Sequence, residues 1–275
     1  MSTAPVVNVE GLWCAHSARF VLRDLNFRIE PGEIAIIVGI NGVGKSTLLA
    51  TIAGALSAAR GNVSVFGYPR RKSVEAERAA RRKALYLPDD GWLPGELQVR
   101  EYLDAAAELF EIPIGEAIDQ IDALLELFSL DRSELQSIGS LSTGQKKKVG
   151  LCAALLSRRE LLLLDEPFSG GLDPAGTSAL RKVLKHQSRE QGKTIVLTTP
   201  VAEVVAELAD RLLVLSDGRL AHNLDRQSLG DLLNQTALSA DALNDLLFPD
   251  AVRRVQRYLE QSSVSGANCP SEVSR

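Results

Sequence analysis

A glycine-rich loop directly after an apolar run constrains this chain more than any other feature. Residues 34–38 are continuously apolar, as in a strand buried on both faces of a sheet. The loop runs from Gly39 to Thr47, and its sequence matches G-x-x-x-x-G-K-[ST]. From Lys45 to Ala55 the pattern becomes helical. A strand, a tight loop and a helix in this order predict an α/β fold with a phosphate-binding loop.

The loop has the chemistry of a triphosphate site. Glycines let the backbone curl so that N–H groups point at phosphate oxygens, and the helix N-terminus adds its positive dipole end. We expect Lys45 to reach the β and γ phosphates and the Ser46 hydroxyl to ligate Mg²⁺. The residues expected to contact the nucleotide here are Gly39, Asn41, Gly42, Val43, Gly44, Lys45, Ser46 and Thr47.

A second apolar run ends in two carboxylates. Residues 161–164 are all leucine, and Asp165 and Glu166 follow them. If this strand lies beside residues 33–38, both acids emerge next to the phosphates. Asp165 suits Mg²⁺ through a water, because that ion prefers hard oxygen ligands and keeps several waters. Glu166 is predicted to polarise the water that attacks the γ phosphate.

The remaining pattern predicts how the chain is organised. Strand-like runs at 6–13, 20–29 and 62–66 are separated by turns, and the signals from 67 to about 140 are mostly helical. Strands and helices then alternate to residue 215, which predicts a mostly parallel sheet covered by helices. Residues 226–261 predict a C-terminal extension of short amphipathic helices, and the small, polar residues 262–275 predict a disordered tail.

Composition excludes several functions. A net charge of -4 and a pI near 5.6 argue against a nucleic-acid partner. The basic runs at 70–72, 78–83 and 146–148 are interpreted as solvated helix faces, with docking charges as the alternative. The three cysteines are distant from each other and predict neither a disulfide framework nor a zinc site. No segment approaches a membrane span and no secretory signal begins the chain, so we expect a cytoplasmic protein.

A third motif indicates the family. The sequence L-S-T-G-Q from Leu141 to Gln145 opens a helix and ends 20 residues before Asp165. It resembles the LSGGQ signature of ATP-binding cassette (ABC) ATPases. The phosphate loop, this signature, the carboxylates and the Leu172-Asp173 turn follow the order of that family at roughly its spacing.

The resemblance covers about residues 5–225 and implies an ATPase domain there. Its fold would be a P-loop NTPase core with a mostly parallel sheet, an N-terminal antiparallel β subdomain and an inserted α-helical subdomain at about 67–140. The cofactors it implies are ATP and Mg²⁺.

The resemblance also implies partners. In a head-to-tail dimer with a second copy or a paralogous cassette, the signature of one subunit would complete the phosphate loop of the other. The signature residues that would contact this nucleotide are Ser142, Thr143, Gly144 and Gln145. An integral membrane transporter subunit would dock near residues 89–96, against Trp92 and Leu93, and hold the cassette peripherally on the inner face of the cell membrane. The single cassette with a short extension resembles exporter-type subunits more than importers with large regulatory domains.

Three positions depart from the family pattern. Asp89 stands where the family has a glutamine, and its carboxylate either ligates Mg²⁺ or orients water, or is a solvated loop acid. Pro200 replaces the switch histidine, and the loss of one positioned donor predicts hydrolysis roughly 100 to 1000-fold slower. Residues 169–171 make the following turn one residue longer than usual, which would alter how two active sites communicate.

Two questions stay open from the sequence. Trp13 and His16 are the candidates for stacking adenine, with Trp13 offering the better π surface, but Trp13 alternatively packs the β subdomain. The rival function is an ATP-dependent clamp that dimerises but hardly turns over, which Pro200 and Asp89 favour and Glu166 opposes. A cassette acting on DNA or ribosomes is disfavoured, because the chain has no basic face and no long heptad repeat.

Overall fold

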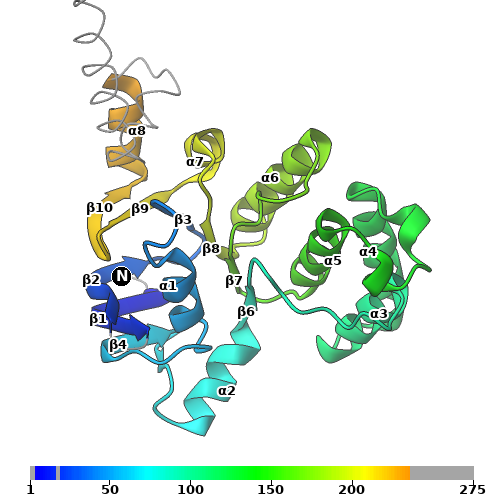
Figure 1. The fold of residues 1–275 in the computed structure, drawn as a ribbon, viewed down its shortest axis with the longest axis horizontal. Helices are drawn as coiled ribbons and strands as arrows, with labels where there is room; N and C mark the ends of the chain where they lie inside the picture. Colours follow the sequence, from blue (N-terminus) through cyan, green and yellow to red (C-terminus); the bar gives the residue numbers. More distant parts are fainter. Residues whose placement is uncertain (1–3, 17–18, 236–275) are drawn as a thin grey trace, which may run out of the picture.

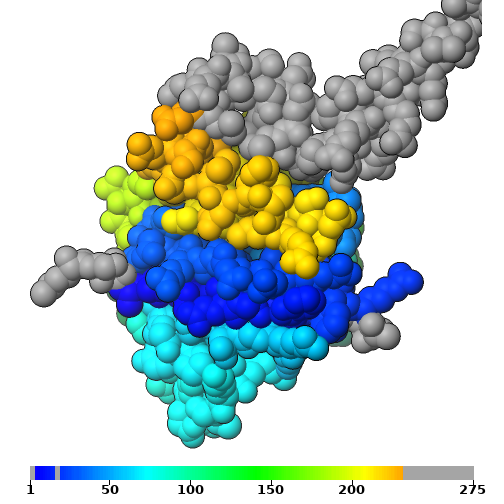
Figure 2. Space-filling model, turned by 90° about the vertical axis from the view of Figure 1, so that its left-hand side faces the viewer, coloured from blue at the N-terminus to red at the C-terminus, as the bar shows by residue number. Residues whose placement is uncertain are grey.

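The chain folds around two β-sheets in the computed structural model, which describes residues 4–16 and 19–235. The smaller sheet is antiparallel and four-stranded, in the order β2-β1-β4-β5. Its strands are β1 (Val7–His16), β2 (Arg19–Ile29), β4 (Arg60–Val65) and β5 (Tyr68–Pro69). Figure 2 shows β1 and β2 crossing one side of the molecule, with α2 (Val74–Lys83) below them and β9 (Arg211–Ser216) and β10 (Arg219–Asp225) above. The expected N-terminal antiparallel subdomain is confirmed.

The larger sheet has six strands in the order β10-β9-β3-β8-β7-β6. Every pairing in it is parallel except that of β10, which runs antiparallel along β9. Its strands are β3 (Ile34–Val38), β6 (Ala84–Leu87), β7 (Leu161–Leu164), β8 (Thr194–Thr198), β9 (Arg211–Ser216) and β10 (Arg219–Asp225). The mostly parallel core sheet is therefore confirmed.

The strand that carries the carboxylates does not adjoin the strand that enters the glycine loop. Strand β8 lies between them, with Leu162 and Ile34 both registered on Ile195. The sequence prediction assumed that these two strands are direct neighbours, and this assumption is wrong. The end of β8 instead lies between the end of β3, where the glycine loop begins, and the end of β7, which is followed by the two acids. Thr198, the last residue of β8, is therefore part of the site.

Helices cover the sheets and form a separate layer (Figure 1). Helices α3, α4 and α5 pack together at the end of the molecule away from the antiparallel sheet. In contrast, α2 packs against β5 and β6, so the first part of the range 67–140 lies with the sheets. The helices are α1 (Lys45–Ile52), α2 (Val74–Lys83), α3 (Val99–Leu109), α4 (Ile114–Leu127), α5 (Thr143–Leu156), α6 (Pro174–Arg189), α7 (Ala202–Leu208) and α8 (Arg226–Gln235), with short 3-10 turns at Asp131–Ser133 and Ile138–Ser140.

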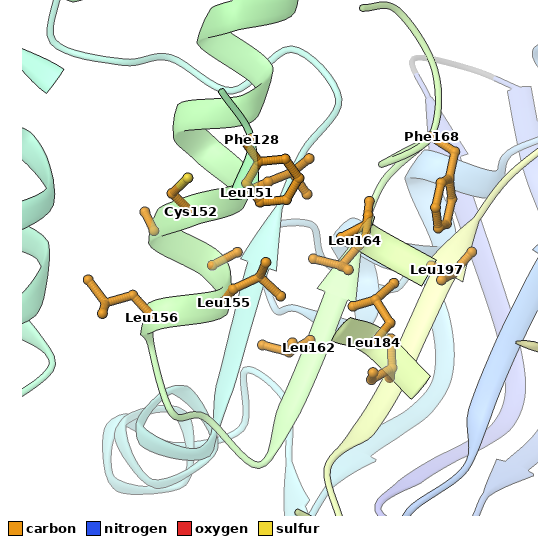
Figure 3. Close-up of a cluster of buried hydrophobic side chains, with 14 of the residues drawn as sticks. Phe128, Leu151, Cys152, Leu155, Leu156, Leu162, Leu164, Phe168, Leu184 and Leu197 are labelled. Carbon is orange, nitrogen blue, oxygen red and sulfur yellow. The ribbon is translucent and has the colours of Figure 1, made fainter. Parts of the chain in front are cut away.

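The apolar runs lie between two hydrophobic cores. Ile36 and Leu162 face a core shared with α3 to α6, whereas Ile37 and Leu163 face the core under the antiparallel sheet. Figure 3 shows the first of these cores, where leucines of α5 meet Leu162 and Leu164 of β7. Burial on both faces is the reason these strands lack the alternation of a surface strand.

The described residues cover only part of the predicted C-terminal extension and tail. Helix α8 occupies the start of the predicted extension 226–261, and its remainder and the tail 262–275 lie outside the described ranges. Within residues 4–16 and 19–235, no helix combines the length and the apolar character needed to cross a bilayer.

Candidate nucleotide-binding site

The glycine loop joins β3 to α1 and has a backbone that other residues rarely adopt. Gly39, Gly42 and Gly44 have φ angles of 150°, 81° and 111°. A Cβ on Gly44 would lie 2.6 Å from the Leu22 side chain, and one on Gly39 would lie 2.5 Å from the Leu215 carbonyl oxygen. The loop is therefore held against β2 and β9 in a shape that requires glycine.

Lys45 lies inside this loop and next to the predicted base. Its side chain is 5% exposed, and Nζ donates to the carbonyl oxygens of Gly39 at 3.0 Å and Ile40 at 3.4 Å. The same Nζ lies 3.7 Å from Oε1 of Glu166. The structure thus brings together the two residues predicted to be catalytic.

The first turn of α1 fits an anion. Its N-cap is Gly44, so no capping side chain accepts from the first amides, and residues 45–48 contain no acid. Ser46 is exposed on this turn, Asn41 and Gly42 are exposed in the loop, and Val43 is buried beneath it. Free amides, one ammonium group and a nearby hydroxyl are the donors that a triphosphate requires.

A single hydroxyl at the end of β8 holds both carboxylate residues. Thr198 Oγ1 donates to Asp165 Oδ1 at 2.7 Å and accepts from the Glu166 backbone N–H at 2.7 Å. Asp165 is 3% exposed and Thr198 is fully buried. The role of Thr198 was not predicted from the sequence, because a threonine that ends an apolar strand carries no signal until the strand order is known.

The surroundings of Asp165 are consistent with a hard-cation ligand. Burial, with a further contribution from the charge of Asp165, raises the pKa of Tyr86 on β6 to about 12, so the phenol stays neutral. The Asp165 carboxylate and the Ser46 hydroxyl are oxygen donors of the kind that Mg²⁺ takes. The residues present therefore fit the predicted cation.

The signature residues cap α5. Ser142 Oγ accepts from the Gln145 backbone N–H at 3.2 Å, and Gln145 Oε1 accepts from the Ser142 backbone N–H at 3.0 Å. Ser142 and Thr143 are exposed, and Gly144 packs so closely on Gly171 that a Cβ would lie 2.8 Å from the Gly171 carbonyl oxygen. Among the described residues no hydrogen bond or ion pair joins 142–145 to the glycine loop, and Figure 1 shows α5 and α1 on opposite sides of β7 and β8.

Asp89 lies in a different environment from Asp165. Its Oδ1 is 2.7 Å from Lys147 Nζ, and the Ser169 hydroxyl lies 3.4 Å from the same oxygen. The side chains of Lys147 and Lys148 are each only 10% exposed. The interpretation of 146–148 as a solvated helix face is therefore wrong for these two lysines.

The adenine candidates lie on the antiparallel sheet. The ring of Trp13 packs edge-on against Phe20, with centroids 5.1 Å apart, and the Arg60 guanidinium lies 5.7 Å from both rings. His16 ends β1 opposite Arg19, and its side chain is outside the described atoms. The contacts of Trp13 match the packing alternative, and adenine stacking stays a prediction.

Together, the two sheets, the glycine loop with its carboxylate pair and the remote capped signature define a P-loop nucleotide-binding cassette. A family profile described as "ABC transporter" matches residues 22–169. Nod factor export ATP-binding protein I of Rhizobium leguminosarum bv. viciae is 35% identical over 219 residues, covering 79% of this chain and 69% of that protein. The protein with the same name from Burkholderia thailandensis is 33% identical over 270 residues, covering 97% and 85%.

Solved structures agree. The ATP-binding subunit of an ABC transporter superposes with a TM-score of 0.77 at 30% identity, covering 88% of this chain and 99% of that one. The dimeric cassette MJ0796 bound to ADP and Pi has a TM-score of 0.71 at 23% identity, covering 80% and 98%, which is evidence for the fold alone. This chain belongs to the ABC transporter family and is one of its ATP-binding subunits.

Proposed function

We propose that this chain hydrolyses ATP in a head-to-tail dimer that closes on two nucleotides and drives separate integral membrane subunits. The observation that carries the proposal is the meeting of Lys45 and Glu166 at 3.7 Å, beside a buried Asp165 and the uncapped N-terminus of α1. Phosphoryl transfer to water needs a positive charge for the phosphates and a base for the water, and here the Lys45 ammonium and the Glu166 carboxylate lie at one edge of the sheet.

Each residue of the site has a separate proposed role. The amides of 39–47 and the Lys45 ammonium would bind the phosphates, and Glu166 would accept the proton of the attacking water. Ser46 and Asp165 would hold Mg²⁺, which when bound neutralises phosphate charge. Asp89, in contrast, is paired with Lys147 through Oδ1, so Lys147 would compete with a metal for that oxygen.

The dimer is proposed from the exposure of the signature. Ser142 and Thr143 face solvent at the N-terminus of α5, where an anion is favoured, yet in the described part of the chain no hydrogen bond joins them to the glycine loop. A second subunit, identical or paralogous, would bring its own nucleotide to this position. Trp13 and His16 are the proposed adenine contacts.

The membrane partner is proposed from the loop 88–96 and from the relatives. Trp92 in this loop is 84% exposed, which suits a docking surface for a partner helix. The similarity to Nod factor export proteins supports an exporter-type assembly, with the cassette peripheral on the cytoplasmic face.

The alternative is a clamp that binds ATP and dimerises but barely hydrolyses it. It is favoured by Pro200, which is exposed at the end of β8 and has no side-chain donor for a γ phosphate. Both functions require ATP binding and dimerisation, and they differ in the rate of ATP hydrolysis.

The test compares Glu166→Gln and Lys45→Ala with the unchanged protein, and uses Glu126→Gln on an exposed face of α4 as a control. Phosphate release should be slow but measurable, and Glu166→Gln should abolish it while keeping ATP binding. Light scattering should show Glu166→Gln as a dimer with ATP and a monomer with ADP, and Lys45→Ala should lose ATP binding. Absence of turnover even with the membrane subunit would establish the clamp, and absence of an ATP-dependent dimer would refute both.

A further inference from the structure

Consecutive lysines at the start of α5 make contacts that the nucleotide site itself does not require. Lys147 Nζ lies 2.7 Å from Asp89 Oδ1 and donates to Ser169 Oγ at 2.8 Å. Lys148 Nζ lies 3.0 Å from Asp173 Oδ2, whose carboxylate also caps α6. This basic run therefore bonds the signature helix to the turn that follows the catalytic carboxylates.

Lys147 is connected to Glu166 through one residue. The hydroxyl of Ser169 donates to the Glu166 carbonyl oxygen at 3.0 Å, and the Ser169 backbone N–H donates to the same oxygen at 3.0 Å. Glu166 has a φ of 44°, a region in which a residue with a side chain persists only when its surroundings hold it. The position of the Glu166 backbone therefore depends on Ser169, and the position of the Ser169 hydroxyl depends on Lys147.

The other partner of Lys147 belongs to a different part of the chain. Asp89 is the second residue of the loop 88–96, whose Trp92 is exposed, and within the described ranges the Lys147 ammonium bonds to Asp89 and Ser169 alone. The Lys147 side chain is 10% exposed and the Asp89 side chain is 44% exposed, so water screens this pair only from the Asp89 side. A displacement of the loop that moves Asp89 will therefore pull on Lys147.

We propose that Lys147 is a positioning residue that couples the loop 88–96 to the catalytic glutamate through Ser169. The inference rests on the proposed function, because it assigns Glu166 the role of base. Among the described residues, no hydrogen bond or ion pair joins Lys147 to the glycine loop, so Lys147 acts on turnover and not on ATP affinity. A partner that displaces the loop would thereby change the rate of hydrolysis.

The first test separates kcat from KM. Lys147→Met keeps the aliphatic stem and removes the ammonium, and we expect kcat for ATP hydrolysis to fall about 10-fold, because a charge-assisted hydrogen bond is lost. KM for ATP should stay within about 2-fold. Lys147→Arg should recover at least half of the rate, and Lys182→Met, on an exposed face of α6, serves as the matched control. If Lys147→Met behaves like the control, or if KM alone changes, the proposal is wrong.

The second test is a double-mutant cycle. Asp89→Asn should reduce kcat by a similar factor, and Asp89→Asn combined with Lys147→Met should be no worse than either single change. Additive losses would show that the two residues act independently and would overturn the coupling.

The third test does not use hydrolysis, so it separates failure of this proposal from failure of the proposed function. The chain has two tryptophans, and a Trp13→Phe background leaves Trp92 as the fluorescent reporter of the loop. Lys147→Met should lower the fluorescence anisotropy of Trp92 relative to Lys182→Met in the same background, because the loop is released. An unchanged anisotropy refutes the link, whether or not the protein turns over.

Discussion

The hydroxyl of Thr198 offers the sharpest test of how this site is held. Thr198→Val keeps the shape of the side chain but removes the group that donates to Asp165 and accepts from the Glu166 N–H, each at 2.7 Å. Both partners then lose a hydrogen bond in a place where Thr198 itself is fully buried. The change therefore affects both carboxylate residues through one atom.

The expected cost follows from these two contacts. Loss of a hydrogen bond to a charged carboxylate costs about 1.5–3 kcal/mol, and an unsatisfied buried N–H costs about 1–3 kcal/mol. The added valine methyl returns roughly 1 kcal/mol of burial. We expect Thr198→Val to reduce the free energy of unfolding by about 3 kcal/mol, a large part of the ~5–15 kcal/mol typical of a domain.

Urea unfolding without nucleotide measures this cost, and Thr198→Ser provides the matched control. Serine keeps the hydroxyl and loses a methyl, which costs about 1 kcal/mol. Phosphate release should follow the same order, with Thr198→Ser close to the unchanged protein and Thr198→Val well below it. If valine is no more destabilising than serine, the hydroxyl does not support the carboxylates and the reasoning fails.

Two further predictions concern other residues. Pro200→His should raise the rate of hydrolysis, because it adds a side-chain donor after Thr198 and Thr199; a phosphate-release assay showing an unchanged or lower rate would mean that another residue already supplies it. Burial, and then the charge of Arg158, lower the pKa of Lys193 from 10.5 to about 8 in the folded protein. Between pH 8 and 10.5 the unfolded chain therefore binds a proton that the folded protein does not. The free energy of unfolding should thus rise as the pH increases from 8 to 10.5. Lys193→Met should accordingly increase the free energy of unfolding by about 2–3 kcal/mol at pH 7 and by much less at pH 10.5; an equal gain in urea titrations at both pH values would contradict this cause.

Local patterns predicted most of the secondary structure. The strand before the glycine loop and the strand before Asp165 are apolar on both faces because each lies between two cores, and this needs no knowledge of the topology. The order of the strands could not be obtained in this way. The sequence places β8 late in the chain, and nothing local to residues 194–198 indicates that it inserts between β3 and β7.

The role of Thr198 was not predicted for the same reason, which is that the strand order was unknown. Thr198 looks like the last residue of a strand, and its role depends on which strands flank it. Likewise, β6 is a strand of four residues among helices, and nothing local to it indicates that it joins the larger sheet. Spacing predicts chemistry within one segment, whereas contacts between segments depend on the crossovers.

The lysines at 146–148 show how a charge run gains a different meaning from its neighbours. On an isolated helix, three adjacent lysines with no acid in the same turn would be solvated. Here α5 begins against the turn 166–173 and the start of the loop 88–96, and each of these segments supplies a carboxylate, Asp173 and Asp89. Since a nearly buried ammonium without a partner would be costly, the two lysines require these acids. The same pairing engages one oxygen of the acid that the sequence offered as a metal ligand, so Lys147 competes with Mg²⁺ for Oδ1 of Asp89.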